Sequence, residues 1–146
     1  MRNTWLFWLI ASFVVLFDRL TKWLVLSRFS LSESIEVIPD ILWFTRIHNT
    51  GVAFGLGQGL NWVFVIVAVA VIVYLTWNVK RMTGDKWLAS SCGLILGGAV
   101  GNLVDRLLYG YVVDFVDVHW FPAFNVADSA LSIAAVVLAI YFWKKE

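Results

Sequence analysis

The stretch VFVIVAVAVIVYL, residues 63–75, decides the fold, because it contains no charged residue and no proline or glycine. It lies within a longer apolar run over residues 60–79, which has the length of about 20 residues that a helix needs to cross a bilayer. Its many β-branched residues would favour a strand in water. In lipid, however, a lone strand leaves its backbone N–H and C=O groups without partners. The run is therefore predicted to be a membrane-spanning helix.

Three further segments of similar length and composition cover about residues 4–26, 87–108 and 123–143. Of all 146 residues, 61% are hydrophobic and only 14% are charged, whereas soluble domains have about 25% charged residues. A chain this short cannot hide so much apolar surface in one core. We therefore expect one all-α integral membrane domain over residues 1–146, with four transmembrane helices.

The composition also excludes several classes of protein. A net charge of +1 provides no basic field to hold nucleic acid. Cys92 is the single cysteine, which excludes a disulfide framework and a cysteine-based metal site. His48 and His119 stand alone, without the HExxH motif of zinc proteases. We expect no metal and no cofactor.

The distribution of lysine and arginine predicts the orientation in the membrane. Six basic residues lie at the termini or in the loop over residues 80–86: Arg2, Lys80, Arg81, Lys86, Lys144 and Lys145. Three lie on the other side, Arg28 and Arg46 in the connection over residues 27–59 and Arg106 near the end of the third span, while Arg19 and Lys22 lie in the outer half of the first span. Both termini are therefore predicted to be cytoplasmic. The first span is interpreted as an uncleaved helix and not a signal peptide, because no small-residue cleavage site follows it. Residues 27–59 and 109–122 become extracytoplasmic loops, and the first should contain a short β-sheet or ribbon in SIEVIPDILWFTRIHN, residues 34–49.

Charged and polar side chains gather toward the outer half of the predicted spans. Inserting an ionisable side chain into a membrane costs about 2.5–3.5 kcal/mol, so such a residue is first considered functional. In DRLTK, residues 18–22, Asp18 and Lys22 are four residues apart and share a helix face. For Lys22 the favoured interpretation is an internal ion pair, with a side chain that reaches toward the interface. Asp18 lies deeper and is as well suited to supporting a site.

Two further motifs offer polar groups beside flexible backbone or on one helix face. In NTGVAFG, residues 49–55, glycines permit a tight backbone and Asn49 offers both a donor and an acceptor. An ordinary turn is the alternative. In GNLVDR, residues 101–106, Asn102, Asp105 and Arg106 lie at positions i, i+3 and i+4 and so share a face, and Asp105 beside Arg106 is expected to form a structural ion pair.

The last two motifs each carry an aspartate in an apolar setting. In VVDF, residues 112–115, Asp114 has apolar neighbours, which raise the pKa of a carboxyl; a solvated loop aspartate is the alternative. In FNVADS, residues 124–129, Asn125 can cap the fourth helix and Asp128 suits its first turn. A position at the lipid boundary is nevertheless costly for an aspartate that only caps a helix.

Two carboxylates close together share a proton, so that one acts as a base toward water and the other as an acid toward a carbonyl oxygen. This is the arrangement of aspartyl proteases. The alternative is a small non-enzymatic transporter, proton-conducting subunit or scaffold with buried acids. Acids spread through the depth of the bilayer would favour that alternative, whereas here they cluster toward one side.

The five motifs, in this order on four spans, resemble those of the lipoprotein signal peptidases, also called signal peptidase II, over about residues 10–140. The resemblance implies an aspartyl endopeptidase of the bacterial inner membrane, with its active site facing outward. Its substrates would be prolipoproteins whose lipobox cysteine carries a diacylglyceryl group, cut just before that cysteine. It further implies contact with membrane lipid and inhibition by globomycin, a cyclic peptide.

Carried over residue by residue, the resemblance implies that Asp114 and Asp128 form the catalytic dyad. It places Asn49 and Gly51 at a sheet edge near the substrate, and Asn125 beside the dyad. It assigns supporting roles to the polar residues of two helical motifs: Asp18, Lys22, Asn102, Asp105 and Arg106.

Overall fold

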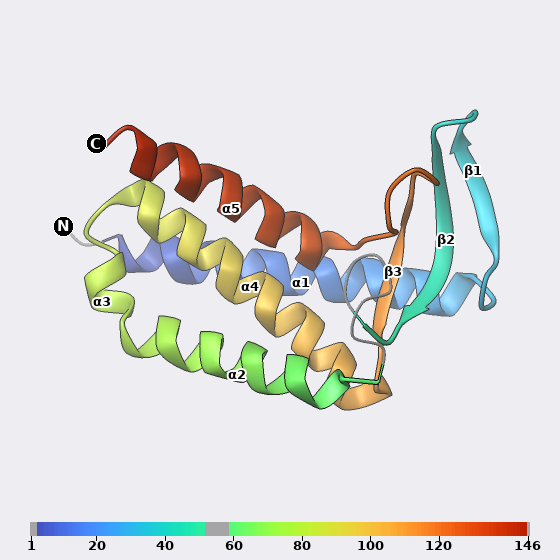
Figure 1. Cartoon of the computed structure of the whole chain (residues 1–146), viewed down its shortest axis with the longest axis horizontal. Helices are drawn as coiled ribbons and strands as arrows, with labels where there is room; N and C mark the ends of the chain where they lie inside the picture. Colours follow the sequence, from blue (N-terminus) through green and yellow to red (C-terminus); the bar gives the residue numbers. More distant parts are fainter. Residues whose placement is uncertain (1–2, 52–58, 146) are drawn as a thin grey trace.

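The structure, a computed structural model, describes residues 3–51 and 59–145. The elements in chain order are α1 (Thr4–Arg28), β1 (Ser34–Ile38), β2 (Leu42–Asn49), α2 (Asn61–Trp77), α3 (Val79–Met82), α4 (Lys86–Tyr109), β3 (Val112–Asp117) and α5 (Val126–Trp143). The long helices α1, α2, α4 and α5 lie along the long axis of the molecule, and the sheet stands at one end (Figure 1). Helix α1 begins and α5 ends at the opposite end.

The long helices fall on the four predicted segments. Helix α5 begins at Val126, three residues later than predicted, because Phe124 still pairs with Val116 of β3 in an isolated bridge. By length and apolar composition, α4 and α5 are the helices in the described part of the chain that can cross a membrane. Helix α2 is apolar but shorter, with 17 residues.

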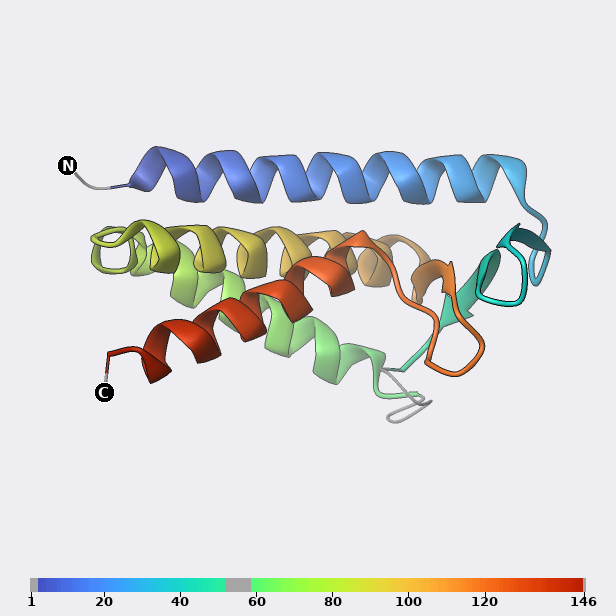
Figure 2. The ribbon, with the colours of Figure 1, turned by 90° about the horizontal axis from the view of Figure 1, so that it is seen from above.

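Helix α4 lies at the centre of the bundle and packs against α1, α2 and α5. Figure 2 shows α1 running alongside α4 while α5 crosses at an angle. Glycines allow the close approach to α1: a Cβ on Gly93 would lie 2.7 Å from the backbone oxygen of Phe7, and one on Gly97 would lie 2.6 Å from Cβ of Val14. Small residues bring membrane helices together in this way, because helices buried in lipid are held largely by close packing.

The sheet has the order β1-β2-β3, and both neighbouring pairs are antiparallel. The predicted short sheet in residues 27–59 is thus confirmed as the hairpin of β1 and β2. Residues 109–122, expected to be a loop only, contribute the third strand, which is a correction. Gly110, with φ of +79°, ends α4 in the left-handed conformation and turns the chain into β3. Residues 52–58 of the glycine-rich segment lie outside the described residues.

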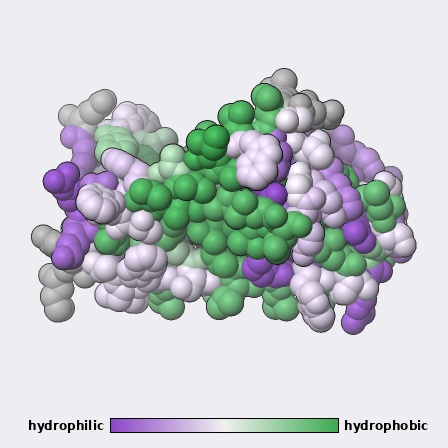
Figure 3. Space-filling view, turned by 90° about the horizontal axis from the view of Figure 1, so that it is seen from below, coloured by the Kyte–Doolittle hydropathy of each residue, from purple (hydrophilic) through white to green (hydrophobic). Residues whose placement is uncertain are grey.

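Large apolar side chains cover much of the outer surface. Trp77 is 87% exposed, and Trp62, Phe13 and Ile66 each expose about two thirds or more of their surface. On the face in Figure 3, hydrophobic residues gather over the middle and hydrophilic residues lie mostly toward the two ends. Contiguous exposed apolar surface of this extent marks contact with a membrane or a partner.

Candidate active site

Strand β3 carries Asp114 to the edge of a pocket. Successive side chains of a strand point to opposite faces. Val113 and Phe115 pack against Val25 of α1 on one face. Asp114 lies on the other face with Val112, which lines the pocket. The carboxyl group is almost fully buried, with 1% of the residue exposed.

Asp128 stands in the first turn of α5 and closes its capping box. The side-chain oxygen of Asn125 accepts a hydrogen bond from the Asp128 backbone N–H at 2.9 Å. In return, Oδ2 of Asp128 accepts from the Asn125 backbone N–H at 3.2 Å. The predicted cap at Asn125 is therefore confirmed, and the same interaction fixes the Asp128 carboxylate.

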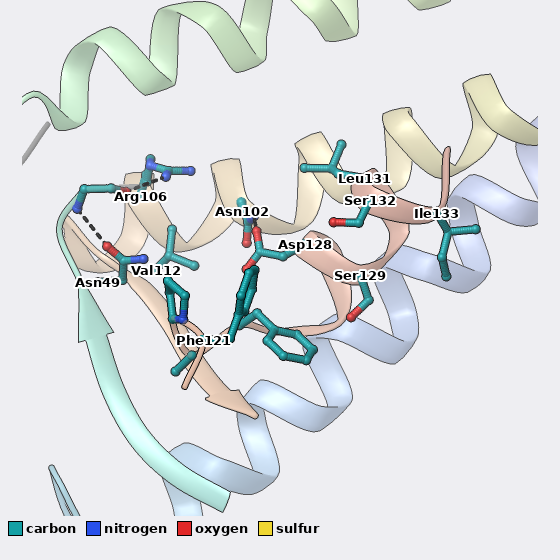
Figure 4. Close-up of a pocket in the computed structure, with 14 residues that line it drawn as sticks. Asn49, Asn102, Arg106, Val112, Phe121, Asp128, Ser129, Leu131, Ser132 and Ile133 are labelled. Carbon is teal, nitrogen blue, oxygen red and sulfur yellow. Dashed lines mark hydrogen bonds between the residues drawn. The ribbon is translucent and has the colours of Figure 1, made fainter. Parts of the chain in front are cut away.

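Three asparagine side chains donate hydrogen bonds to the two carboxylates. Asn49 of β2 donates to Oδ2 of Asp114 at 2.8 Å, and Asn125 donates to Oδ1 of Asp114 at 2.7 Å. Asn102 of α4 donates to Oδ1 of Asp128 at 2.8 Å. Figure 4 shows Asn102 and Asp128 lying side by side in the pocket. Because Asn125 contacts Asp114 with its amide nitrogen and Asp128 with its backbone and amide oxygen, it joins the two aspartates directly.

A buried charged cluster lies next to Asp114 and Asp128, the pair of aspartates called the dyad below. Lys22 Nζ is 2.9 Å from Oδ2 of Asp18 and 2.8 Å from Oδ2 of Asp105, and Arg19 contacts both aspartates through Nη2. Lys22 also donates to Oδ1 of Asn102 at 3.0 Å, which uses the last of its three donors. The amide of Asn102 is thereby oriented with its nitrogen toward Asp128. The predicted pairing of Asp18 with Lys22 is confirmed.

The aspartates of this cluster also hold the backbone that carries the dyad. Oδ2 of Asp105 accepts from the N–H of Val113 at 3.0 Å, one residue before Asp114. Oδ1 of Asp18 accepts from the N–H of Ala127 at 3.0 Å, one residue before Asp128. Each dyad aspartate therefore follows a residue whose peptide group is fixed by a buried carboxylate.

The expected ion pair between Asp105 and Arg106 is corrected, because Asp105 pairs with Arg19 and Lys22 instead. Consecutive residues on a helix point about 100° apart, so Arg106 points away from the cluster. Arg106 Nη2 donates to the carbonyl oxygen of Gly51 at 3.3 Å, and its guanidinium lies 5.2 Å from the ring centroid of Phe64.

The pocket beside the dyad has a volume of about 470 Å³. Its polar lining includes Asn49, Asn102, Arg106 and Asp128, all named from the sequence. Sequence reasoning missed Ser129 and Ser132 of α5, and it missed the contribution of Arg19 to the charged cluster. A signal for Arg19 was present, since it lies within DRLTK. The serines follow Asp128 along α5, but serines in a helix carry no distinctive signal of their own.

The surroundings of Asp114 alter its acidity. Burial raises the pKa of Asp114, and the nearby charge of Asp128 raises it further, to about 7. The hydrogen bonds from Asn49 and Asn125 act in the opposite direction, because they stabilise the charged form. A pKa near 7 is in the range that suits a general acid or base at neutral pH.

Comparison with known proteins supplies the family. The family model described as "Signal peptidase (SPase) II" matches residues 10–144. The "Lipoprotein signal peptidase" of Halothermothrix orenii is 40% identical over 139 residues, which cover 95% of this chain and 96% of the relative. The "Lipoprotein signal peptidase" of Pseudomonas syringae pv. tomato is 43% identical over 155 residues, covering 99% and 88%.

The fold agrees with a solved structure of a bacterial membrane enzyme, with a TM-score of 0.88 and 36% sequence identity. The alignment covers 93% of this chain and 86% of that structure. These matches favour the peptidase over the transporter or scaffold considered from the sequence. The chain belongs to the signal peptidase II family, the lipoprotein signal peptidases, which are aspartic-type peptidases of the bacterial membrane.

Proposed function

We propose that Asp114 and Asp128 are the catalytic dyad with which this lipoprotein signal peptidase cleaves the signal peptides of prolipoproteins. The observation that carries the proposal is their connection through Asn125, which contacts both carboxyl-bearing residues in a buried site. Two carboxyls held in this way titrate as a pair and share one proton near neutral pH.

The reaction follows from the shared proton. The charged carboxylate takes a proton from a water molecule, whose oxygen attacks the carbonyl carbon of the scissile bond. The protonated carboxyl donates its proton to the carbonyl oxygen. When the tetrahedral intermediate collapses, the C–N bond breaks and a proton passes to the leaving amine. The asparagines hold the carboxylates in place throughout, because each dyad oxygen accepts a hydrogen bond from Asn49, Asn102 or Asn125.

The remaining residues support or extend the dyad. Asp18 and Asp105 fix the peptide groups before the two catalytic residues, and Lys22 links them to Asn102. Arg106 and Gly51 lie together at the pocket and are proposed to bind the substrate backbone. No step of this scheme uses a metal ion, and the independence of cleavage from metal stays a prediction.

In the membrane we propose four spans with both termini cytoplasmic and the dyad facing outward in the bacterial inner membrane. The pocket then lies at the outer interface, where apolar Leu131 and Ile133 can contact a signal helix and a diacylglyceryl chain while polar groups contact the cut site. The cut falls just before the lipidated cysteine. A globomycin-type cyclic peptide is proposed to occupy the same pocket.

The test is cleavage by Asp114→Asn and Asp128→Asn variants. Each should lower the rate of signal-peptide removal from a diacylglyceryl-modified prolipoprotein by roughly 1,000-fold or more, because the shared proton is lost. The measurement is cleavage by purified enzyme in detergent, with and without globomycin.

Asp117→Asn is the matched control. Asp117 ends the same strand, but it binds Thr45 and the His119 backbone N–H rather than the asparagines of the site. Its variant should cleave at nearly the wild-type rate. Substantial turnover by either dyad variant, with an unchanged unfolding temperature, contradicts the assignment.

A further inference from the structure

A second cavity lies at the end of the molecule opposite the dyad, between the beginning of α4 and the end of α5. Its volume is about 410 Å³. It is lined by Trp87, Val137, Ile140, Tyr141, Lys144 and Lys145, which we call the basic groove. Figure 1 shows that these helix ends meet far from the sheet. The groove therefore shares no lining residue with the active-site pocket.

The lysines of the basic groove form no ion pair in the described part of the chain, because no carboxylate there lies within ion-pair distance of Lys144 or Lys145. Lys145 instead donates to the hydroxyl of Tyr141, and its Nζ lies 4.4 Å from the centroid of that ring. The hydrogen bond to Tyr141 and, less strongly, the more distant charge of Asp85 raise the pKa of Lys145. Two N–H donors of the Lys145 ammonium and the hydroxyl hydrogen of Tyr141 therefore remain available to bind an anion.

Asp85 is held at the beginning of α4 and does not reach the lysines. Oδ1 of Asp85 accepts from the backbone N–H groups of Trp87 at 2.8 Å and of Leu88 at 3.2 Å, and so caps α4. Lys86 follows it in the sequence and adds a further positive charge. The polar end of the groove is therefore suited to an anion.

The remainder of the groove is apolar, and the proposed topology brings its polar end to a membrane interface. Ile140 and Trp87 are exposed, at 46% and 58%, and Val137 lies about one helical turn before Ile140 in α5. Helix α5 has 18 residues, which gives about 27 Å at 1.5 Å per residue. This is close to the roughly 30 Å of hydrocarbon in a bilayer. With the dyad at one interface, as the proposed function has it, the lysines reach the other.

We propose that the basic groove binds an anionic phospholipid of the leaflet opposite the active site. Its phosphate lies between Lys144 and Lys145 and accepts a hydrogen bond from the Tyr141 hydroxyl. One acyl chain lies along Val137 and Ile140, and the Trp87 ring packs at the level of the headgroup, where tryptophan is favoured. Basic pockets between helices at this side of a membrane hold anionic headgroups by the same charge complementarity.

The test compares lipids and matched variants. Purified full-length protein in detergent is titrated with phosphatidylglycerol, phosphatidylcholine or inorganic phosphate, and bound lipid is counted by native mass spectrometry. Phosphatidylglycerol should bind preferentially to the wild type. The double variant Lys144→Gln/Lys145→Gln should weaken that binding about 25-fold, or about 5-fold for each lysine near an anionic surface.

The control is the double variant Lys80→Gln/Arg81→Gln, which removes the same charge at the same end of the molecule but from α3, outside the groove. Its affinity for phosphatidylglycerol should remain within about 2-fold of the wild type. An equal loss in the control overturns the proposal in favour of a diffuse field. Equal binding of phosphatidylcholine also overturns it. So does full competition by inorganic phosphate, which would identify a free-anion site.

The outcome is separable from the test of the dyad. The Asp114→Asn variant should retain phosphatidylglycerol as the wild type does, because Asp114 lies at the other end of the molecule. Lipid retention by the Asp114→Asn variant together with full cleavage would contradict the dyad alone. If the wild type cleaves its substrate normally but binds phosphatidylglycerol and phosphatidylcholine equally, only the lipid site in the groove is contradicted.

Discussion

At the scale of single residues, Asn125 performs two tasks that use different parts of its side chain. Its oxygen caps α5 by accepting from the Asp128 N–H, whereas its nitrogen donates to Asp114 at 2.7 Å. The nitrogen also lies 3.2 Å from Oδ1 of Asn102 and 3.3 Å from the Val113 carbonyl oxygen. A substitution can therefore remove one task and leave the other.

Replacing Asn125 by serine or by alanine separates these tasks. Serine caps helices nearly as well as asparagine but is too short to reach Asp114, so Asn125→Ser should lower kcat and lose only the stability that comes from the buried amide contacts. Asn125→Ala loses the cap as well, so its free energy of unfolding should fall by about 1 kcal/mol more than that of Asn125→Ser. Cleavage kinetics and denaturant unfolding of the purified variants measure the two effects. Equal stability losses in both variants would show that the cap is not the separable part.

The pKa of Asp114 predicts a pH dependence of cleavage. Because the shared proton leaves as the pH rises through about 7, kcat/KM of the wild type should fall on the alkaline side of that value. The hydrogen bond from Asn49 favours the charged form, so Asn49→Ala should raise the pKa and move the alkaline limb upward by about 1 pH unit. Profiles of kcat/KM from pH 5 to 9 test this. A limb that moves to lower pH in Asn49→Ala contradicts the role given to Asn49.

The sequence predicts most residues of the site but not all of their contacts. Asp114 and Asp128 stood out because aspartates flanked by apolar residues are costly near a membrane. The partner of Asp105 did not follow from the chain order. Adjacency in sequence suggested Arg106, whereas helix geometry turns Asp105 toward α1 and brings Arg19 and Lys22, more than 80 positions earlier, into contact.

At the scale of elements, the packing of α1 on α4 sets the position of the charged cluster. A Cβ on Gly101 would lie 2.8 Å from Oδ2 of Asp18 and 3.1 Å from Cβ of Ala127. The glycine thus permits α1, α4 and the first turn of α5 to meet where the dyad is held. The sequence predicted these helices but not β3, because its residues Val112–Phe115 are all buried and show no alternation of polar and apolar side chains.

Substitution of Gly101 tests this contact. Gly101→Ala should displace the Asp18 carboxylate, and with it the Ala127 N–H that it holds, and so lower kcat at least 10-fold. Gly84→Ala is the control, since a Cβ on Gly84 meets nothing within 4 Å. Both variants are compared by cleavage rate and by unfolding temperature. Wild-type kinetics in Gly101→Ala would show that Asp18 does not position α5.

At the scale of the whole molecule, the sheet lies at one end, and α1 begins and α5 ends at the other (Figure 1). Composition alone predicted a membrane protein, because 61% hydrophobic residues cannot be buried in a chain of this size. The side of the membrane that each end faces is predicted from the distribution of lysine and arginine.

Reporter fusions test the orientation. A reporter that is active only outside the cytoplasm should be active when joined at Glu33 and inactive at Gly84 and at the C-terminus. A second reporter, active only in the cytoplasm, should give the reverse pattern at the same three positions. Cytoplasmic activity at Glu33 would place the dyad on the wrong side for an exported substrate.

The pairing of Asp18 with Lys22 within α1 has a consequence for biogenesis. Asn102, the partner that Lys22 finds on α4, is 80 positions later in the chain. At about 5–20 residues per second, the ribosome needs roughly 4–16 seconds to reach it. During that interval α1 can already lie in lipid, and the local pair lets its aspartate and lysine neutralise each other before α4 has been made. The pair then persists in the folded protein, where Lys22 gains Asp105 and Asn102 as further partners.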